Sequence, residues 1–248
     1  MGSEMCIRDR VDILAFFYRA TLEKITLSLS DRIVAVSEFV KKTYLAGYES
    51  KASVVYPGVD GDVFQLENMG DRGEIVFVGQ LNMGHRWKGL EDLLKAMKIL
   101  KDEGMDLLLN VVGSGELENY YKKLAQSYGI SAVFHGRITT EKLVNIYNRC
   151  KCVVLPSKSK AEAFGMVLIE GAACGCGAVG SRIGGIPEVL SSLEYSYPFN
   201  PEDISGLISA IRVCMSEDID FKHQRRSALR FNWEKTAQAV EVVMREIA

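Results

Sequence analysis

Residues 74–181 alternate between short apolar runs and longer amphipathic stretches. Short runs rich in β-branched residues predict strands, and stretches with apolar residues at helical spacing predict helices. The expected strands are EIVFVG, LLLNVVG, AVFHG, KCVVLP and GAVGS, and the expected helices are GLEDLLKAMKILKDEG, ELENYYKKLAQSYG, TEKLVNIYNRC and FGMVLIEGAACG. This alternation favours an α/β fold with a doubly wound, mainly parallel sheet, in which ligands bind beyond the carboxyl ends of the strands.

The flanking segments carry a shorter version of the same pattern. Before the alternation we expect a helix over residues 11–29, a strand IVAV, a helix EFVKKTYLAG capped by Ser37, and a strand SVVYP. After it we expect a strand near residues 194–199 and helices over 201–216 and 233–247. Polar residues 57–73 lack periodicity, which is typical of a linker. The predicted units are therefore 11–56, a linker 57–73, a main domain 74–230 and a final helix within 231–248.

Composition and charge narrow the class of protein. The chain has 248 residues, 48% of them hydrophobic, and a formal net charge of −2, which gives no general reason to expect a nucleic-acid partner. Its six cysteines fall largely in or beside apolar runs, so we expect them to be reduced and buried. With three histidines and no zinc-type spacing, we expect no metal site.

Targeting signals are weak in this sequence. No uncharged apolar stretch is long enough to span a membrane, although peripheral contact with one stays open. Residues 1–10, MGSEMCIRDR, lack the apolar core of a signal peptide and look like translated cloning or adaptor sequence. We expect a cytoplasmic protein, in solution or at the inner face of the membrane.

The stretch with the most chemical information is residues 157–170, SKSKAEAFGMVLIE, where a polar loop leads into an apolar helix. Free amides at a helix start near Phe164 would attract phosphate. Glu162 would lie at the mouth of that helix and Glu170 about two turns inside it, and carboxylates accept hydrogen bonds from hydroxyl groups. A nucleotide-sugar fits this layout. Taken alone, two such glutamates are more often a helix cap and a solvated surface residue than parts of a binding site.

Several motifs together resemble the nucleotide-sugar-binding half of the retaining glycosyltransferases of family 4, which have the GT-B fold. The motifs, in the order of the family, are DRIVAVSEFVKKTYLAGY, SVVYPGVDGDVF, IVFVGQL, WKGLEDLLKA, VVGSGELE, VFHGRI, VVLPS, EAFGMVLIEGAACG, GSRIGGIPEV and FNWEKTA. The resemblance implies a Rossmann-like C-terminal domain in residues 74–230. It also implies that residues 11–56 are a remnant of the N-terminal acceptor domain, and that the final helix crosses back to that domain.

The resemblance also implies roles for individual residues. Glu162 would contact the transferred sugar, Glu170 the nucleotide ribose, and Lys88 the phosphate whose charge grows as the glycosidic bond breaks. Further donor contacts are implied at Gly79, Gln80, Gly113, Arg137, Ile138, Phe164, Gly165, Met166 and Val167. Gln80 departs from the family, which usually has arginine there, so either Lys88 acts with a different cation, Arg86 or His85, or activity is lowered.

The implied activity is transfer of a sugar from a UDP- or GDP-sugar to an acceptor hydroxyl, on a saccharide, a lipid-linked molecule or another acceptor, without a metal or other cofactor. The histidine and glycine-rich loop of the family's N-terminal domain are not found, so we expect the C-terminal half of an enzyme, inactive by itself. A nucleotide-sugar-binding fragment is the main alternative. An NAD-type dehydrogenase is a weaker one, because VGQLNM replaces the Gly-x-Gly-x-x-Gly turn.

Overall fold

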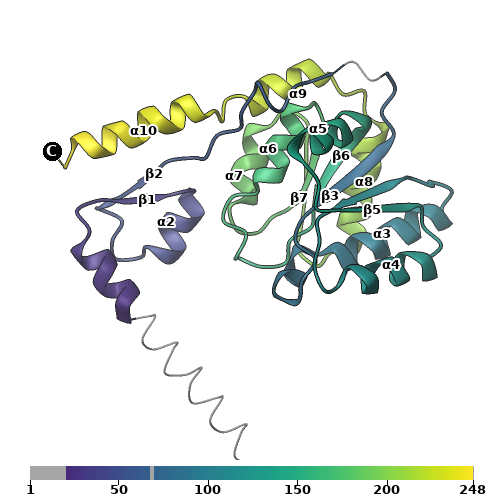
Figure 1. Ribbon diagram of the computed structural model, residues 1–248, viewed down its shortest axis with the longest axis horizontal. Helices are drawn as coiled ribbons and strands as arrows, with labels where there is room; N and C mark the ends of the chain where they lie inside the picture. The colour runs from purple at the N-terminus through teal and green to yellow at the C-terminus, as the bar shows by residue number, and fades with distance from the viewer. Residues whose placement is uncertain (1–20, 68–69, 248) are drawn as a thin grey trace, which may run out of the picture.

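A six-stranded parallel sheet forms the centre of the protein (Figure 1). The computed structural model describes residues 21–67 and 70–247. The strands are β3 (Glu74–Val78), β4 (Leu109–Val112), β5 (Ala132–Gly136), β6 (Cys150–Leu155), β7 (Gly177–Ser181) and β8 (Ser196–Phe199). Their order is β5-β4-β3-β6-β7-β8 and every neighbouring pair is parallel, which confirms the expected fold class.

Helices cover both faces of this sheet (Figure 1). One core lies under α3 (Leu90–Asp102), α4 (Glu118–Ser127) and α8 (Ile204–Ser216), and the other under α5 (Thr140–Arg149), α6 (Met166–Ala173) and α7 (Ile186–Ser192). Successive strand residues point to opposite faces. Accordingly, Cys152 and Val154 of β6 belong to the first core, whereas Val153 and Leu155 belong to the second. This burial on both faces explains why the strands are continuous apolar runs.

The strand order reverses between β3 and β6. From β3 the chain moves outward through β4 to β5, and then returns to the other side of β3 to form β6. Loops that leave the carboxyl ends of two such strands diverge and leave a crevice, where ligands of doubly wound folds bind. Residues 79–89, after β3, and residues 156–165, which we call the β6–α6 loop, border this crevice.

A smaller unit precedes the sheet domain. It contains a helix over residues 21–29, β1 (Ile33–Ala35), α2 (Glu38–Tyr44) and β2 (Ala52–Val54), and β1 pairs with β2 in parallel. As expected, Ser37 caps α2 by accepting a hydrogen bond from the amide of Val40. Residues 1–20 lie outside the described residues, so the expected helix over 11–29 is seen only from residue 21.

The two units are joined by two segments that lie side by side. The Val59 amide donates to the Phe231 carbonyl at 3.0 Å, and a Cβ on Gly58 would stand 2.2 Å from the nitrogen of Trp233. From this crossing α10 (Trp233–Arg245) runs away from the sheet domain towards β1 and β2 (Figure 1). An ion pair of 2.9 Å joins Arg32 to Glu246 just beyond its end. None of the helices within residues 21–67 and 70–247 is long and apolar enough to cross a membrane.

Three helical segments were not expected from the sequence. They are the 3-10 helix η1 (Met83–Lys88), α7 and α9 (Phe221–Ala228). In addition, α6 begins at Met166 rather than near Phe164, because Gly165 precedes it in the left-handed conformation at φ 98°. A helix cannot continue through such a residue, and glycine adopts this conformation without steric cost.

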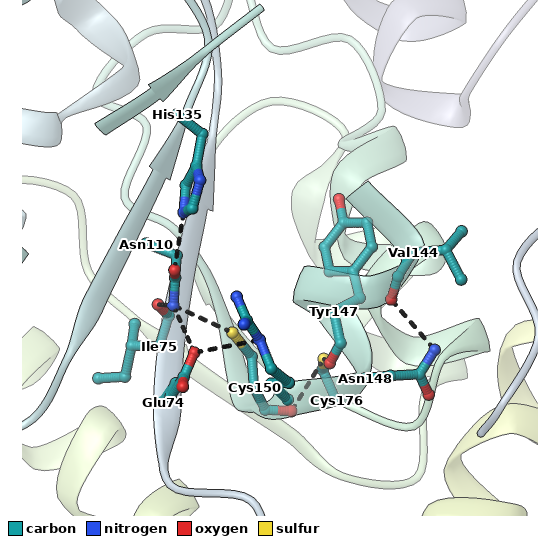
Figure 2. A network of polar contacts seen from close by, with 10 residues as sticks. Glu74, Ile75, Asn110, His135, Val144, Tyr147, Asn148, Cys150 and Cys176 are labelled. Atoms are coloured by element: carbon teal, nitrogen blue, oxygen red, sulfur yellow. Dashed lines mark hydrogen bonds and ion pairs between the residues drawn. The ribbon is translucent and has the colours of Figure 1, made fainter. Parts of the chain in front are cut away.

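A partly buried polar network crosses the first three strands of the sheet (Figure 2). The Asn110 side chain donates to the Glu74 carboxylate at 2.8 Å, and its Oδ1 lies 2.8 Å from Nε2 of His135. His135 is therefore hydrogen-bonded within the fold. Burial, reinforced by Arg149, lowers the pKa of His135 below its ordinary value of 6.5. Among residues 21–67 and 70–247 the cysteines are buried as well, namely Cys150, Cys152, Cys174, Cys176 and Cys214, and burial raises the pKa of Cys174 to about 12.

The lowered pKa of His135 predicts a pH-dependent stability. The folded state binds fewer protons at this site than the unfolded chain, so the contribution is complete above pH 6.5 and is lost as the pH falls through the folded pKa. We expect the melting temperature of the His135→Gln variant to fall less than that of the wild type between about pH 7.5 and pH 5. His223→Gln, at an exposed histidine paired with Glu194, is the control. Equal pH dependence in all three proteins would contradict the prediction.

Candidate functional site

An ion pair spans the crevice between β3 and β6. Lys88, the last residue of η1, donates from Nζ to Oε2 of Glu162 at 3.0 Å, and the two side chains are only 17% and 12% exposed. Ser157 is fully buried and its hydroxyl donates to the same oxygen at 3.1 Å. The Ser157 carbonyl in turn accepts from the Ser181 hydroxyl at 2.6 Å. The carboxylate is therefore held by a cation and by a hydroxyl that is itself fixed.

The backbone around Glu162 is held by very close contacts. The Gly185 amide donates to the Glu162 carbonyl at 2.9 Å. A Cβ on Gly184 would lie 2.0 Å from that carbonyl oxygen, and one on Gly185 would lie 2.0 Å from the carbonyl oxygen of Ala163. Only glycine fits at such distances, so GSRIGGIPEV packs against the β6–α6 loop through its two glycines.

The β6–α6 loop ends at the start of α6. Phe164 is buried, Gly165 takes the N-cap position, and the first helical amides are those of Met166 and Val167. Glu170 lies little more than one turn inside α6, rather than the two turns expected, because the helix begins later.

Glu170 is bonded to a buried tyrosine. The hydroxyl of Tyr147, on α5, donates to Oε2 of Glu170 at 3.2 Å. Burial raises the pKa of Glu170, and the bond from Tyr147 opposes that shift. The carboxylate therefore lies in a partly desolvated place, where hydrogen bonds to a ligand are stronger than in water.

A cavity of about 650 Å³ opens where β3, β4 and β5 end. Glycines follow or end these strands: Gly79, Gly113 and Gly136. Gly113 has φ 133° and a Cβ there would lie 1.8 Å from the carbonyl oxygen of Gly79. The other residues that line the cavity are Val78, Gln80, Val112, Ser114, Arg137, Ile138 and Leu143.

Arg86 and His85, the two residues considered as substitutes for the missing arginine, contact other partners in the structure. Arg86 pairs with Glu91 of α3 at 3.1 Å, and Nδ1 of His85 lies 2.6 Å from Oδ1 of Asn82. Gln80 is exposed and accepts a hydrogen bond from the Asn82 side chain. The side chains of Arg86 and His85 are therefore held by Glu91 and Asn82. Their contacts do not support the hypothesis that one of them is a second cation next to Lys88.

The predicted site residues thus fall into three neighbouring groups. Lys88 pairs with Glu162; Glu170 follows Phe164, Gly165, Met166 and Val167 at the start of α6; and the cavity collects Gly79, Gln80, Gly113, Arg137 and Ile138. Sequence reasoning assigned no role to Ser157, Tyr147 or the pair Gly184–Gly185. A signal existed for the glycines, because two glycines in succession mark a turn or loop.

This arrangement suits an elongated anionic ligand. A lysine and free helix amides favour phosphate, and fixed carboxylates favour the hydroxyl groups of sugars. The glycine-edged cavity next to them offers backbone groups and apolar side chains to a flat ring. All three groups lie at the carboxyl ends of the strands, on both sides of the reversal in strand order.

Comparison with known proteins gives consistent results. A family model described as "Glycosyl transferases group 1" matches residues 60–232. An uncharacterized glycosyltransferase of Methanocaldococcus jannaschii is 28% identical over 229 residues, which cover 88% of this chain and 60% of the relative. Sucrose-phosphate synthase from Thermosynechococcus elongatus superimposes with a TM-score of 0.79 at 24% identity, covering 93% of this chain and 61% of that one.

A second solved structure is Anabaena HepE in complex with UDP and glucose. It superimposes with a TM-score of 0.69 at 18% identity, covering 87% of this chain and 63% of that one. The chain therefore spans less than two thirds of the length of each of these three proteins.

Proposed function

Because the chain belongs to the glycosyl transferases group 1 family and shares the GT-B type of fold, we propose that it binds a nucleotide-diphosphate sugar and supplies the donor half of a retaining, family 4 glycosyltransferase. The observation that carries the proposal is the Lys88–Glu162 pair in the crevice between β3 and β6. It sets a cation for phosphate next to a carboxylate for sugar hydroxyls, at the position where doubly wound folds bind ligands.

The proposed donor lies across the three groups of residues. Its base enters the cavity edged by Gly79, Gly113 and Gly136, and its ribose hydroxyls reach Glu170. The diphosphate meets Lys88 and the first amides of α6, and the transferred sugar meets Glu162. UDP and glucose in the Anabaena neighbour support a donor of this class.

In the proposed reaction the bond between the anomeric carbon and the phosphate oxygen breaks as the acceptor hydroxyl bonds to the same face of that carbon. The departing phosphate takes the proton of the hydroxyl, so no protein nucleophile is required. Lys88 and the α6 amides stabilise the charge that grows on the phosphate, which lowers the barrier because these groups are already oriented. These groups meet the phosphates in place of a metal ion.

The alternative is a protein that binds the donor without transferring the sugar. Acceptor groups are expected in a part of the enzyme that this chain does not match, since it spans 60% of the archaeal relative. Calorimetric titration of the chain with UDP-glucose, GDP-mannose and NAD tests binding, and release of UDP or GDP with and without added saccharides tests transfer. Binding without turnover would favour the alternative. Binding of NAD but of neither nucleotide-sugar would overturn the proposal.

Glu170→Ala is expected to lower the affinity for UDP about tenfold, because a hydrogen bond between a charged and a neutral group contributes roughly 1.5 kcal/mol at the lower end of its range, and 1.4 kcal/mol corresponds to a factor of ten. The lost affinity should come from the hydrogen bonds to the ribose hydroxyls. Wild-type protein should therefore prefer UDP to its 2′,3′-dideoxy analogue, whereas the variant should bind both alike in calorimetry. Glu118→Ala, at an exposed ion pair on α4, is the control. Unchanged discrimination between the two nucleotides would remove Glu170 from the ribose site.

A further inference from the structure

Glu188 joins the two units of the protein. It lies in the first turn of α7, and its carboxylate accepts hydrogen bonds from the backbone amides of Glu38 at 2.8 Å and Phe39 at 2.6 Å. These are the first amides of α2, which have no partner inside their own helix and carry partial positive charge. The Tyr56 hydroxyl donates to the same carboxylate at 3.2 Å. Three donors from residues 21–56 therefore converge on one side chain of the sheet domain.

The state of Tyr56 is consistent with this role. Burial, reinforced by the negative charge of Glu188, raises the pKa of the Tyr56 hydroxyl. The hydroxyl therefore stays protonated near neutral pH and can donate its hydrogen bond. The acidic group nearest to this contact on α2 itself is Glu38, which also contributes to the shift.

The same two units meet again at the β6–α6 loop. The fully buried hydroxyl of Ser37 donates to the Ala163 carbonyl at 2.7 Å, and the hydroxyl of Tyr44 donates to the Lys160 carbonyl at 3.1 Å. The ring of Tyr56 packs on Phe164 with the centroids 5.8 Å apart. Residues on both sides of Glu162 are thus held from the smaller unit.

The residues at the start of α7 contact the β6–α6 loop from the side opposite to α2. Gly184 and Gly185, which stand four and three residues before Glu188 in the chain, press against the carbonyls of Glu162 and Ala163. The segment around Glu162 therefore lies between α2 and α7, and Glu188 binds these two helices to each other. A shift of α2 away from α7 would remove support from the loop that carries Glu162.

We propose that Glu188 is a positioning residue for sugar transfer, which clamps α2 to α7 and thereby fixes the β6–α6 loop and the carboxylate of Glu162. Hydrogen bonds from amides to a carboxylate are stronger than those between neutral groups, so the clamp stabilises the start of α2 more than a neutral helix cap would. Glu188 acts through the loop. Its loss should therefore impair recognition of the sugar end of the donor more than that of the nucleotide end.

Hydrogen exchange of the full chain, measured by mass spectrometry, tests the clamp directly. In Glu188→Ala we expect exchange to accelerate roughly tenfold in peptides over 37–41 and 157–165, with β3, β4 and α3 unchanged. Glu188→Gln keeps the shape and one accepting oxygen, so its effect should be intermediate. Glu141→Ala, at an exposed first-turn glutamate of α5, should change neither peptide. Acceleration confined to 37–41, or a uniform acceleration over the whole chain in both Glu188 variants, would overturn the proposal.

A second readout rests on the proposed function. Wild-type protein should bind UDP-glucose or GDP-mannose more tightly than the corresponding nucleoside diphosphate. Glu188→Ala should lose this difference while its affinity for UDP or GDP stays within about twofold, because Glu170 and the cavity are not altered. An equal loss for both ligands would contradict a positioning role. If wild-type protein bound none of these ligands, the proposed function would fail, but the exchange experiment would still decide whether the clamp exists.

Discussion

Replacing Lys88 with alanine is expected to weaken the binding of UDP or GDP by about tenfold to a hundredfold, the largest loss among the site residues. A charge-assisted hydrogen bond contributes roughly 1.5–3 kcal/mol, and 1.4 kcal/mol corresponds to a factor of ten. Part of this gain is offset in the wild type, because Lys88 must give up some of its interaction with Glu162 when phosphate arrives. Calorimetry with the nucleoside diphosphate and with the nucleoside alone measures the effect.

The comparison of two ligands makes this prediction specific. Uridine or guanosine has no phosphate, so its affinity should stay the same in Lys88→Ala. Lys98→Ala is the matched control, since Lys98 lies on α3 in an ion pair with Asp102 and its side chain is 42% exposed. If the variant lost affinity for nucleoside and diphosphate alike, Lys88 would support the fold of the crevice rather than bind phosphate.

Replacing Gly113 with alanine is expected to destabilise the folded protein by roughly 3–5 kcal/mol. The residue has φ 133°, and a Cβ there would lie 1.8 Å from the carbonyl oxygen of Gly79, far inside the contact distance. Relief would require β3 and β4 to separate at their carboxyl ends, where the Gly79 amide donates to the Val112 carbonyl at 2.9 Å. Urea denaturation should show a lower midpoint with little change in slope.

The Gly104→Ala variant separates the two causes of the lower stability, which are the strained backbone conformation and the clash with the Gly79 carbonyl oxygen. Gly104 follows α3 at φ 90°, but a Cβ there would meet no atom within 4 Å. Its replacement should therefore lower the stability of the folded protein only through the strain of the left-handed conformation, by about 1–2 kcal/mol. Equal destabilisation by the two substitutions would show that conformational strain alone accounts for the effect and that the close approach of Gly79 is tolerated.

The sheet could be predicted from the sequence because its strands are buried on both faces. Continuous apolar runs such as KCVVLP result from that burial, and the amphipathic stretches between them mark helices that cover one face each. Parallel pairing followed from the alternation alone. The position of β6 next to β3 needs contacts between residues far apart in the chain, which local pattern does not contain.

The helices that were missed lack the pattern that predicts a helix. In α9 the buried positions include Gln224 and Ser227, whose polar groups are satisfied by hydrogen bonds to the carbonyls of Cys176 and Gln224. The buried side chains there are polar and are stabilised by hydrogen bonds, so the pattern of apolar residues does not indicate a helix. The short η1 has no buried residue at all.

At the site, the sequence indicates candidate residues but not the contacts between them. The sequence indicated Glu162 and Lys88 as separate contributors, and the structure pairs them across the crevice. Tyr147 lies within the predicted helix TEKLVNIYNRC, whose pattern gives no sign that its hydroxyl meets Glu170. Such pairings join segments that are distant in sequence, and a single sequence carries no information about which distant segments meet.

The glycines at the ends of β3, β4 and β5 restrict how the cavity proposed to bind the base can evolve. Gly79, Gly113 and Gly136 already have the smallest side chain, so substitution at these positions can narrow the cavity but cannot widen it. Its edge also consists of main-chain atoms, which every residue type shares. New ligand preferences therefore have to arise at the flanking side chains, such as Gln80, Arg137 and Ile138, while the glycine edge stays the same in descendants with different substrates.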